Sequence, residues 1–256
     1  MRRRDEREKM KEKRWNILSG AALKWAAIII MLTDHIGASL IEQFIAGSYG
    51  FPFPAQSALD GQFWYRIDLI LRCIGRSAFP IFCFLLVEGA VHTRNARRYA
   101  LRLAAFAAIS EIPFDLALTK GAFSPQMQNV FFTLLLGFLC VQAFRRCFEQ
   151  SWKAWLFVFA ACALAELLHT DYGAVGILVI VMMYLLRDRF WQMIIFSYLF
   201  LSLVMGMEIY SLPGFLLLGL YNGKKGRQPR WFFYAFYPAH LLVLWAAGTY
   251  LLPLFR

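Results

Sequence analysis

A lysine, an aspartate and a histidine lie within one apolar stretch near the amino terminus, from Lys24 to Gly37. Ionisable groups are costly inside a membrane-spanning helix and are usually functional there. His35 follows Lys24 by eleven positions, which places the two side chains within roughly 20° of one helix face and about 16 Å apart. That face offers a cation for an anionic group at one end and a titratable base toward the other. The alternative is that Asp34 and His35 only satisfy a partner helix.

A second apolar stretch carries charges at helical spacing. Asp68, Arg72 and Arg76 follow one another at intervals of four residues, so they line one helix face. An ion pair between Asp34 and Arg72 or Arg76 would lower the cost of burying both charges. Because neighbouring residues on a helix diverge by about 100°, Asp34 is poorly placed to bond His35 itself. We therefore expect an acidic group on another helix to orient the imidazole.

Further polar groups are expected to face the same region. Glu111 and Asp115 share a face around Pro113, which suggests a distorted helix that lines a cavity. Ser110 can donate a hydrogen bond to an oxyanion, although serine is also common at packed helix interfaces. His240 is either a second catalytic group or a satisfied core residue. The candidate catalytic residues are thus His35, Asp34, Arg72, Arg76, Glu111, Ser110 and His240.

Another polar cluster is expected at the cytoplasmic ends of the same helices. Guanidinium groups bind phosphate through paired hydrogen bonds, so the cluster suits a phosphate-rich ligand. An ordinary basic loop that sets topology is the other interpretation for Arg97 and Arg98. Lys24 and Arg102, in contrast, lie about a turn inside their spans. The candidate cofactor-binding residues are Lys24, Glu88, His92, Arg94, Asn95, Arg98 and Arg102.

The composition is typical of a membrane protein. Of the 256 residues, 60% are hydrophobic and 17% aromatic, with a mean hydropathy of +0.52, whereas a soluble domain is about half apolar. The net charge of +11 would suggest nucleic acid in a soluble chain. Here the cations gather at the ends of apolar stretches, so we expect no nucleic-acid partner. The five cysteines have neither paired nor metal-ligand spacing and are expected to be reduced, and no metal site is predicted.

These elements predict an all-α, polytopic membrane helical bundle of about nine transmembrane helices. Residues 17–256 form one transmembrane domain and residues 1–16 a charged cytoplasmic tail. The spans are expected at 17–41, 63–91 with an interruption at Gly75 and Pro80, 99–118, 129–144, up to 168, 173–187, 190–205, 209–221 and 231–252. Twenty Lys and Arg then lie in cytoplasmic segments and only Lys120 and Arg256 outside. This asymmetry predicts a cytoplasmic amino terminus.

Several strings resemble the TraX family, in order over nearly the whole chain. They are Leu23-Lys24, Leu32–Gly37, Gly75–Phe82, Glu88–Asn95, Tyr99–Leu103, Ser110–Phe114, Asn129–Thr133, Asp171–Gly176 and Phe236–His240. The family is named for a bacterial inner-membrane protein that acetylates the amino terminus of conjugative pilin with acetyl-CoA as donor. The spacing of Lys24 and His35 is also similar to that in membrane acyltransferases that O-acetylate surface glycans, where Arg is commoner at the first position. Lysosomal heparan-glucosaminide acetyltransferase resembles the same broad superfamily.

Residues and resemblance together imply a membrane acetyltransferase of the cytoplasmic membrane. It would move an acetyl or short acyl group from cytoplasmic acyl-CoA to an amine or hydroxyl at the outer side, such as a pilin-like peptide amino terminus or a surface glycan. His35 would act as general base or carry the acyl group covalently. Arg72 or Arg76, with Ser110, would stabilise the oxyanion. The phosphates of the donor would be held by Lys24, Arg94, Arg98 and Arg102.

Two other classes of function stay open. Intramembrane Asp, His and Arg also mark the ion paths of proton- or metabolite-coupled transporters. Such transporters commonly show inverted repeats and paired broken helices, which the sequence does not display. A structural partner in a surface-assembly complex is the third class, and it would tolerate loss of His35. The pattern does not choose between acceptors, acyl lengths, direct or covalent transfer, or oligomeric states.

Overall fold

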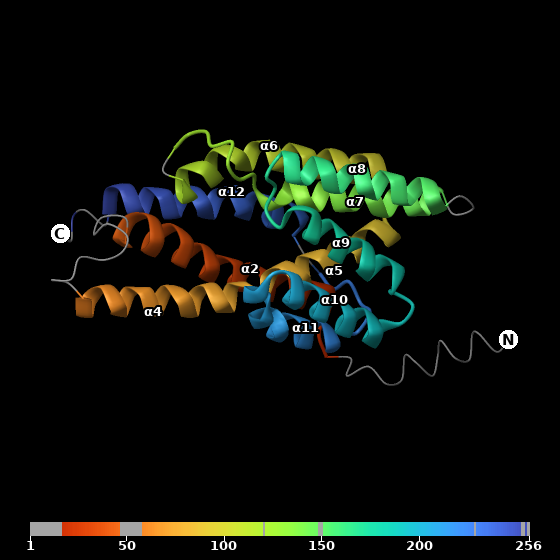
Figure 1. The fold of residues 1–256 in the computed structure, drawn as a ribbon, viewed down its shortest axis with the longest axis horizontal. Coiled ribbons are helices and arrows are strands. Elements are labelled where there is room, and N and C mark those ends of the chain that lie inside the picture. Colours follow the sequence, from red (N-terminus) through yellow and green to blue (C-terminus); the bar gives the residue numbers. More distant parts are fainter. Residues whose placement is uncertain are drawn as a thin grey trace.

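The computed structural model describes residues 17–46, 58–119, 121–147, 151–227, 229–251 and 254, and these are almost entirely helical (Figure 1). In chain order the elements are α2 (Gly20–His35), the π-helix η1 (Ile36–Ala46), α4 (Ala58–Gly75), α5 (Ala78–His92), α6 (Ala96–Leu118), α7 (Val130–Arg146), α8 (Ser151–Leu167), α9 (Gly173–Leu185), α10 (Phe190–Val204), the 3-10 helix η3 (Gly206–Ser211), α11 (Leu212–Gly219), α12 (Arg230–Ala246) and the π-helix η4 (Ala247–Leu251). The predicted tail, residues 1–16, lies outside the described residues.

Helix α2 has a satisfied amino end. The Ser19 hydroxyl accepts a hydrogen bond from the Ala22 amide at 3.2 Å, as an N-cap does. The amides of Gly20 and Ala21 donate at 2.8 Å to the carbonyls of Lys224 and Lys225. The loop before α12 therefore closes over the start of α2.

The other end of α2 changes its helical register. At Ile36 the α-helix continues as η1, directly after Asp34 and His35. π-helical turns occur frequently at functional sites. The altered register re-aims the following side chains relative to a straight α-helix, and the helix extends past the expected end at residue 41 to Ala46.

The expected interruption of the second span is confirmed at Gly75, whereas Pro80 lies within α5. Helix α4 ends at Gly75 and α5 begins at Ala78. A Cβ added at Gly75 would overlap the Asp34 side chain, so the glycine lets α2 and α4 approach closely, as small residues do between membrane helices. Figure 1 shows α2, α4 and α12 extending together from one end of the molecule.

Helix α5 lies at the centre of the bundle. It packs against α2, α7, α9 and α11, while α6 packs against α7 and α12. The side chains of Ile81, Cys83 and Ala90 on α5 are fully buried. The five cysteines are all free thiols.

Three helical stretches among the described residues are long and apolar enough to cross a membrane: Gly20–Glu42, Gln62–His92 and Trp231–Leu251. The prediction of one spanning helix over 209–221 is wrong, because this stretch divides between η3 and the eight-residue α11. Eight residues reach only about 12 Å, far less than the roughly 30 Å of a bilayer core. Helix α6 continues through Pro113 from Ala96 to Leu118, so the proline does not end the helix.

Candidate functional site

Asp34 is held by two arginines, Arg72 in the last turn of α4 and Arg76 directly after it. The Nη1 atom of Arg72 lies 2.6 Å from Oδ2 of Asp34, and Nη2 of Arg76 lies 3.1 Å from Oδ1. The predicted pairing is therefore confirmed with both arginines at once. Arg72 also contacts Glu42 of η1 through Nε at 3.3 Å. Two carboxylates around Arg72 lower the cost of burying its charge.

A glutamate that the sequence reasoning overlooked completes this network. Nη1 of Arg76 lies 3.3 Å from Oε1 of Glu208, which is 1% exposed. The Tyr172 hydroxyl donates to the same Oε1 at 3.0 Å. A signal did exist, because Glu208 is the one charged residue between Arg189 and Lys224, and an isolated charge in such an apolar run indicates function.

Tyr172 and Asp171 reach the network from the turn between α8 and α9. Tyr172 has a φ of 62°, a left-handed conformation that costs free energy in a residue with a side chain. Its ring stacks on Phe79, with centroids 3.5 Å apart. Burial raises the pKa of the Asp171 carboxyl to about 6, and the nearby Arg76 opposes that rise. His169 of the same turn is exposed, as expected.

The two histidines of the candidate set meet although 205 positions separate them. Nδ1 of His35 lies 2.6 Å from Nε2 of His240, and Nδ1 of His240 lies 2.8 Å from the Phe236 carbonyl oxygen. The expectation that an acidic group orients His35 is wrong, because a second imidazole does so. His35 is 9% exposed and His240 6%.

His35 also lines a polar cavity of about 210 Å³. Its charged and titratable lining consists of Asp34, His35, Glu42, Arg72, Arg76, Asp171 and Tyr172. Phe114 and Leu118 of α6 close part of its wall. Helix α6 therefore does line a cavity, but through apolar side chains.

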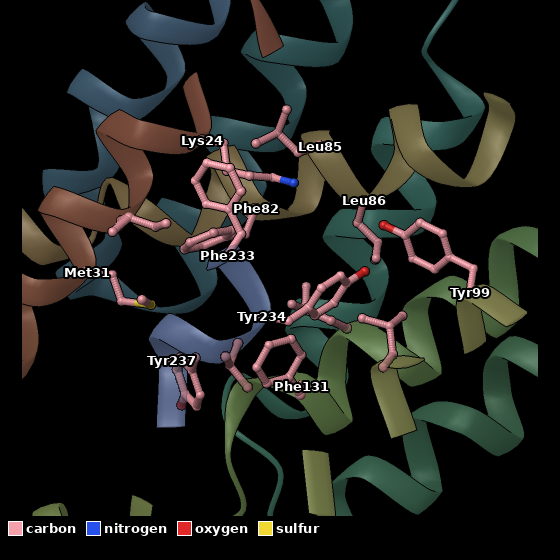
Figure 2. Close-up of a pocket in the computed structure, with 14 residues that line it drawn as sticks. Lys24, Met31, Phe82, Leu85, Leu86, Tyr99, Phe131, Phe233, Tyr234 and Tyr237 are labelled. Carbon is pink, nitrogen blue, oxygen red and sulfur yellow. The ribbon is translucent and has the colours of Figure 1, made fainter. Parts of the chain in front are cut away.

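A second cavity, of about 90 Å³, is mostly apolar and runs beside α2 (Figure 2). Lys24 lies at one end, with Nζ 4.9 Å from the centre of the Phe233 ring. Figure 2 shows Tyr237 toward the opposite end of the lining. The Tyr237 ring packs edge-on against His35, with centroids 5.8 Å apart. Met31, one turn before His35, lines the same cavity, so this cavity ends beside the histidine pair.

The remaining predicted catalytic residues lie elsewhere on α6. Glu111 accepts a hydrogen bond from the Asn129 side chain, which caps α7. Asp115 accepts one from the Ser124 amide at 2.8 Å. Ser110 is fully buried, and its hydroxyl has no partner among the described residues. The structure does not bring Glu111 or Ser110 to the lining of the polar cavity.

The predicted phosphate cluster is only partly assembled. Arg102 lies 5.3 Å from the centre of the Tyr99 ring, and Tyr99 and Lys24 both line the apolar cavity. Arg94 and Arg98 are exposed at the start of α6. Arg102 thus contacts the Tyr99 ring, which lines the apolar cavity together with Lys24.

Three other members of that cluster have local structural contacts. Asn95 caps α6 by accepting a hydrogen bond from the Arg98 amide at 2.9 Å. Glu88 accepts one from the Tyr221 hydroxyl at 3.1 Å. Nδ1 of His92 lies 2.9 Å from the Glu88 carbonyl oxygen. These local contacts explain why the three polar residues occur here, with no bound phosphate group required.

Comparison with known proteins agrees with the resemblance of the sequence strings. The chain is 29% identical over 259 residues to the probable fimbrial assembly protein FimC, serogroup H1, of Dichelobacter nodosus, covering 91% of this chain and 97% of that relative. No solved structure matches the chain significantly. The family model described as TraX protein matches residues 19–247, which include both histidines and the ion-pair network. The chain belongs to the TraX family.

Proposed function

We propose that this chain is a multi-pass acetyltransferase of the bacterial cytoplasmic membrane. It moves an acetyl or short acyl group from cytoplasmic acyl-CoA to an acceptor on the outer side. The observation that supports this best is that His35 lines the polar cavity and packs against Tyr237, which lines the apolar cavity. An apolar passage suits the arm of an acyl donor, and a charged chamber suits a polar acceptor.

Membrane insertion is supported by the three long apolar helical stretches and by the asymmetry of Lys and Arg along the chain. In the proposed orientation the amino end of α2 faces the cytoplasm. Lys24 then lies near the inner side and the polar cavity deeper in the membrane or toward the outer side. Donor and acceptor approach His35 from opposite directions.

The donor site follows from the apolar cavity. Lys24, with Arg102 beyond the Tyr99 ring, supplies positive charge for the phosphates of CoA at the cytoplasmic end. The pantetheine arm then passes along α2, where the separation of Lys24 and His35 is about 16 Å. The surrounding aromatic and aliphatic side chains exclude water, which protects the thioester from hydrolysis.

The chemistry uses His35 as general base. It accepts the proton of an amine or hydroxyl as that group attacks the thioester carbon. Arg72 stabilises the developing oxyanion, since none of the described contacts uses its Nη2 atom. The carbon–sulfur bond then breaks, and the imidazolium returns the proton to the thiolate. Covalent transfer through an acyl-His35 intermediate is the variant of this scheme.

An amine is the favoured acceptor. The polar cavity is lined by the carboxylates of Asp34, Glu42 and Asp171 but by only two guanidinium groups. A net negative lining attracts the ammonium form of an amine. This form releases one proton to water, and the neutral amine then attacks and gives a second proton to His35. The fimbrial assembly name of the relative from Dichelobacter nodosus agrees with a pilin-associated role. A pilin-like peptide amino terminus is therefore the acceptor we propose.

The test is acetylation by the purified protein in detergent or liposomes. His35→Ala is expected to abolish transfer from acetyl-CoA to a pilin-like peptide, measured by mass spectrometry. The variant should keep its melting temperature and its thermal shift with CoA, because His35 only adjoins the donor cavity. The control is His169→Ala in the exposed turn, which should keep full activity. Full activity in His35→Ala, or no thermal shift with CoA in the wild type, would contradict the proposal.

A further inference from the structure

We infer that His240 is a positioning residue that holds His35 in the tautomer with its proton on Nδ1, so that Nε2 is the basic atom. This inference rests on the proposed function only for its catalytic consequence. The tautomer itself follows from a chain of two hydrogen bonds that ends on a backbone carbonyl. The chain runs from His35 on α2 to His240 and then to Phe236, both on α12.

The Phe236 carbonyl at the end of this hydrogen-bond series determines which ring nitrogens carry protons. A carbonyl oxygen can only accept, so Nδ1 of His240 must carry a proton to bond the Phe236 oxygen at 2.8 Å. In a neutral imidazole the other nitrogen is then an acceptor. Nε2 of His240 therefore accepts from Nδ1 of His35 at 2.6 Å. Neutral His35 consequently has an unprotonated Nε2.

The geometry of the two rings supports a hydrogen bond in their common plane. Their planes differ by 3° and their centroids are 4.9 Å apart. Rings stacked face to face at that angle would not bring their nitrogens to 2.6 Å at such a centroid separation. The lone pair of His240 thus points at the Nδ1 proton of His35.

The surroundings keep the resting pair neutral. Both rings are at least nine-tenths buried, and an uncompensated imidazolium is costly there. Arg72 and Arg76 face His35 from α4 and its end, so a further positive charge is unfavourable. The facing carboxylate of Asp34 is already bonded to both arginines. Asp171, Glu42 and the Tyr172 hydroxyl lie on the same cavity lining.

Local contacts within α12 hold the His240 ring that accepts the hydrogen bond from His35. The Phe236 carbonyl and the His240 side chain belong to one helical turn. The rings of Phe236 and Tyr237 pack on His240, with centroids 4.8 Å and 5.6 Å away. His240 lines neither cavity, whereas His35 lines the polar one. We therefore assign His240 the role of orienting the His35 ring, and His35 the role of transferring the proton.

The consequence for catalysis is a base that is ready before the acceptor arrives. The hydrogen bond between the two rings uses Nδ1 of His35, and His35 also lines the polar cavity, so we assign Nε2 to the substrate. When it takes a proton from the acceptor, the bond from Nδ1 to His240 becomes charge-assisted and strengthens. The neutral imidazole of His240 thus stabilises the His35 imidazolium that forms during attack.

The direct test is nitrogen NMR of the intact protein in detergent with labelled histidine. The chain has only four histidines, so His35→Ala and His240→Ala variants assign the two buried rings. Correlations between ring protons and nitrogens distinguish a protonated from an unprotonated nitrogen. We expect unprotonated Nε2 and protonated Nδ1 in both rings. A proton on Nε2 of His35 in the neutral wild type would overturn the inference.

The kinetic test uses two variants of His240. Without an acceptor for Nδ1, the proton of His35 redistributes between its nitrogens, so His240→Ala should lower kcat by about 10- to 100-fold with unchanged KM for acetyl-CoA. His240→Gln places an amide oxygen near the former Nε2 and should recover most of kcat. The matched control is His169→Ala, which removes an exposed histidine outside both candidate sets and should leave kcat and the NMR signals of both buried rings unchanged. Equal losses of kcat in the Ala and Gln variants would contradict the inference.

The two proposals can fail separately. A wild-type protein with the expected tautomer but no acetyl transfer would refute the proposed function and leave the tautomer assignment standing. Acetyl transfer that is unchanged in His240→Ala would support the function and refute the positioning role.

Discussion

At the scale of single residues, Arg76 connects more elements than any other side chain of the network described above. It donates through Nε to the Arg72 carbonyl at 3.2 Å, through Nη2 to Asp34 and through Nη1 to Glu208. These contacts join α2, α4 and η3 around a side chain that is 18% exposed. Removal of one partner from such a buried network leaves the opposite charges buried and unpaired. This lowers the free energy of unfolding more than replacement of the whole network by apolar side chains would.

We expect Arg76→Met to lower the free energy of unfolding by about 3–5 kcal/mol, because Glu208 loses its cation and Asp34 keeps only Arg72. Titration with a denaturing detergent, followed by circular dichroism, measures this change. The matched variant is Arg187→Met, which removes a half-exposed arginine 3.9 Å from Asp188. It should cost at most about 1 kcal/mol. Similar losses in both variants would show that the Arg76 network does not stabilise the fold.

At the scale of elements, the site depends on how closely α2 approaches α4. Asp34 occupies the space that a side chain at Gly75 would need. Gly37 on η1 similarly faces Arg72 and Asp68, where an added Cβ would lie 2.8 Å from Oδ1 of Asp68. Glycines at these two positions allow the backbones to approach and the ion pairs to form across the contact.

Gly75→Ala should therefore displace Asp34 from Arg72 and Arg76. Overpacking of this kind typically costs about 1–3 kcal/mol, and we also expect loss of acetyl transfer because the arginines move relative to His35. Thermal melting and the peptide acetylation assay measure the two effects. Gly206→Ala is the control, since nothing lies within 4 Å of the added Cβ there. An unchanged melting temperature in Gly75→Ala would rule out the close approach.

At the scale of the whole molecule, the bundle holds an apolar and a polar cavity, and His35, which lines the polar one, contacts Tyr237 of the apolar one. Helices α2, α5, α6, α7 and α12 surround the apolar cavity (Figure 2). The polar cavity is lined by residues of α2, η1, α4, α6 and the turn before α9. No single helix makes either wall, so the proposed passage from one side to the other exists only in the folded bundle.

Met31→Trp is expected to block the apolar cavity one turn before His35. The KM for acetyl-CoA should rise at least about tenfold, equivalent to about 1.4 kcal/mol, because the larger ring occupies the path of the donor. Steady-state acetylation and the thermal shift with CoA measure this effect. Ile29→Trp makes the same change at a side chain that is 63% exposed and should leave KM unchanged. If both variants bind CoA like the wild type, the donor does not use this cavity.

The sequence by itself determined the helical class, most helix positions and the pairing of Asp34 with Arg72 and Arg76. Helical periodicity is local, and the cost of a buried charge requires an opposite charge at similar depth. The family also followed from sequence strings distributed along the chain, as the match over residues 19–247 confirms.

Only the tertiary structure decided that His240 meets His35, that Glu208 completes the network, and that Ser110 and Glu111 do not line the polar cavity. Periodicity shows which residues share one face of a helix. It does not encode the rotation of that helix against partners that are distant along the chain, or the short 3-10 turn that carries Glu208 inward. Those contacts depend on packing between helices, because each rotation buries a different set of side chains.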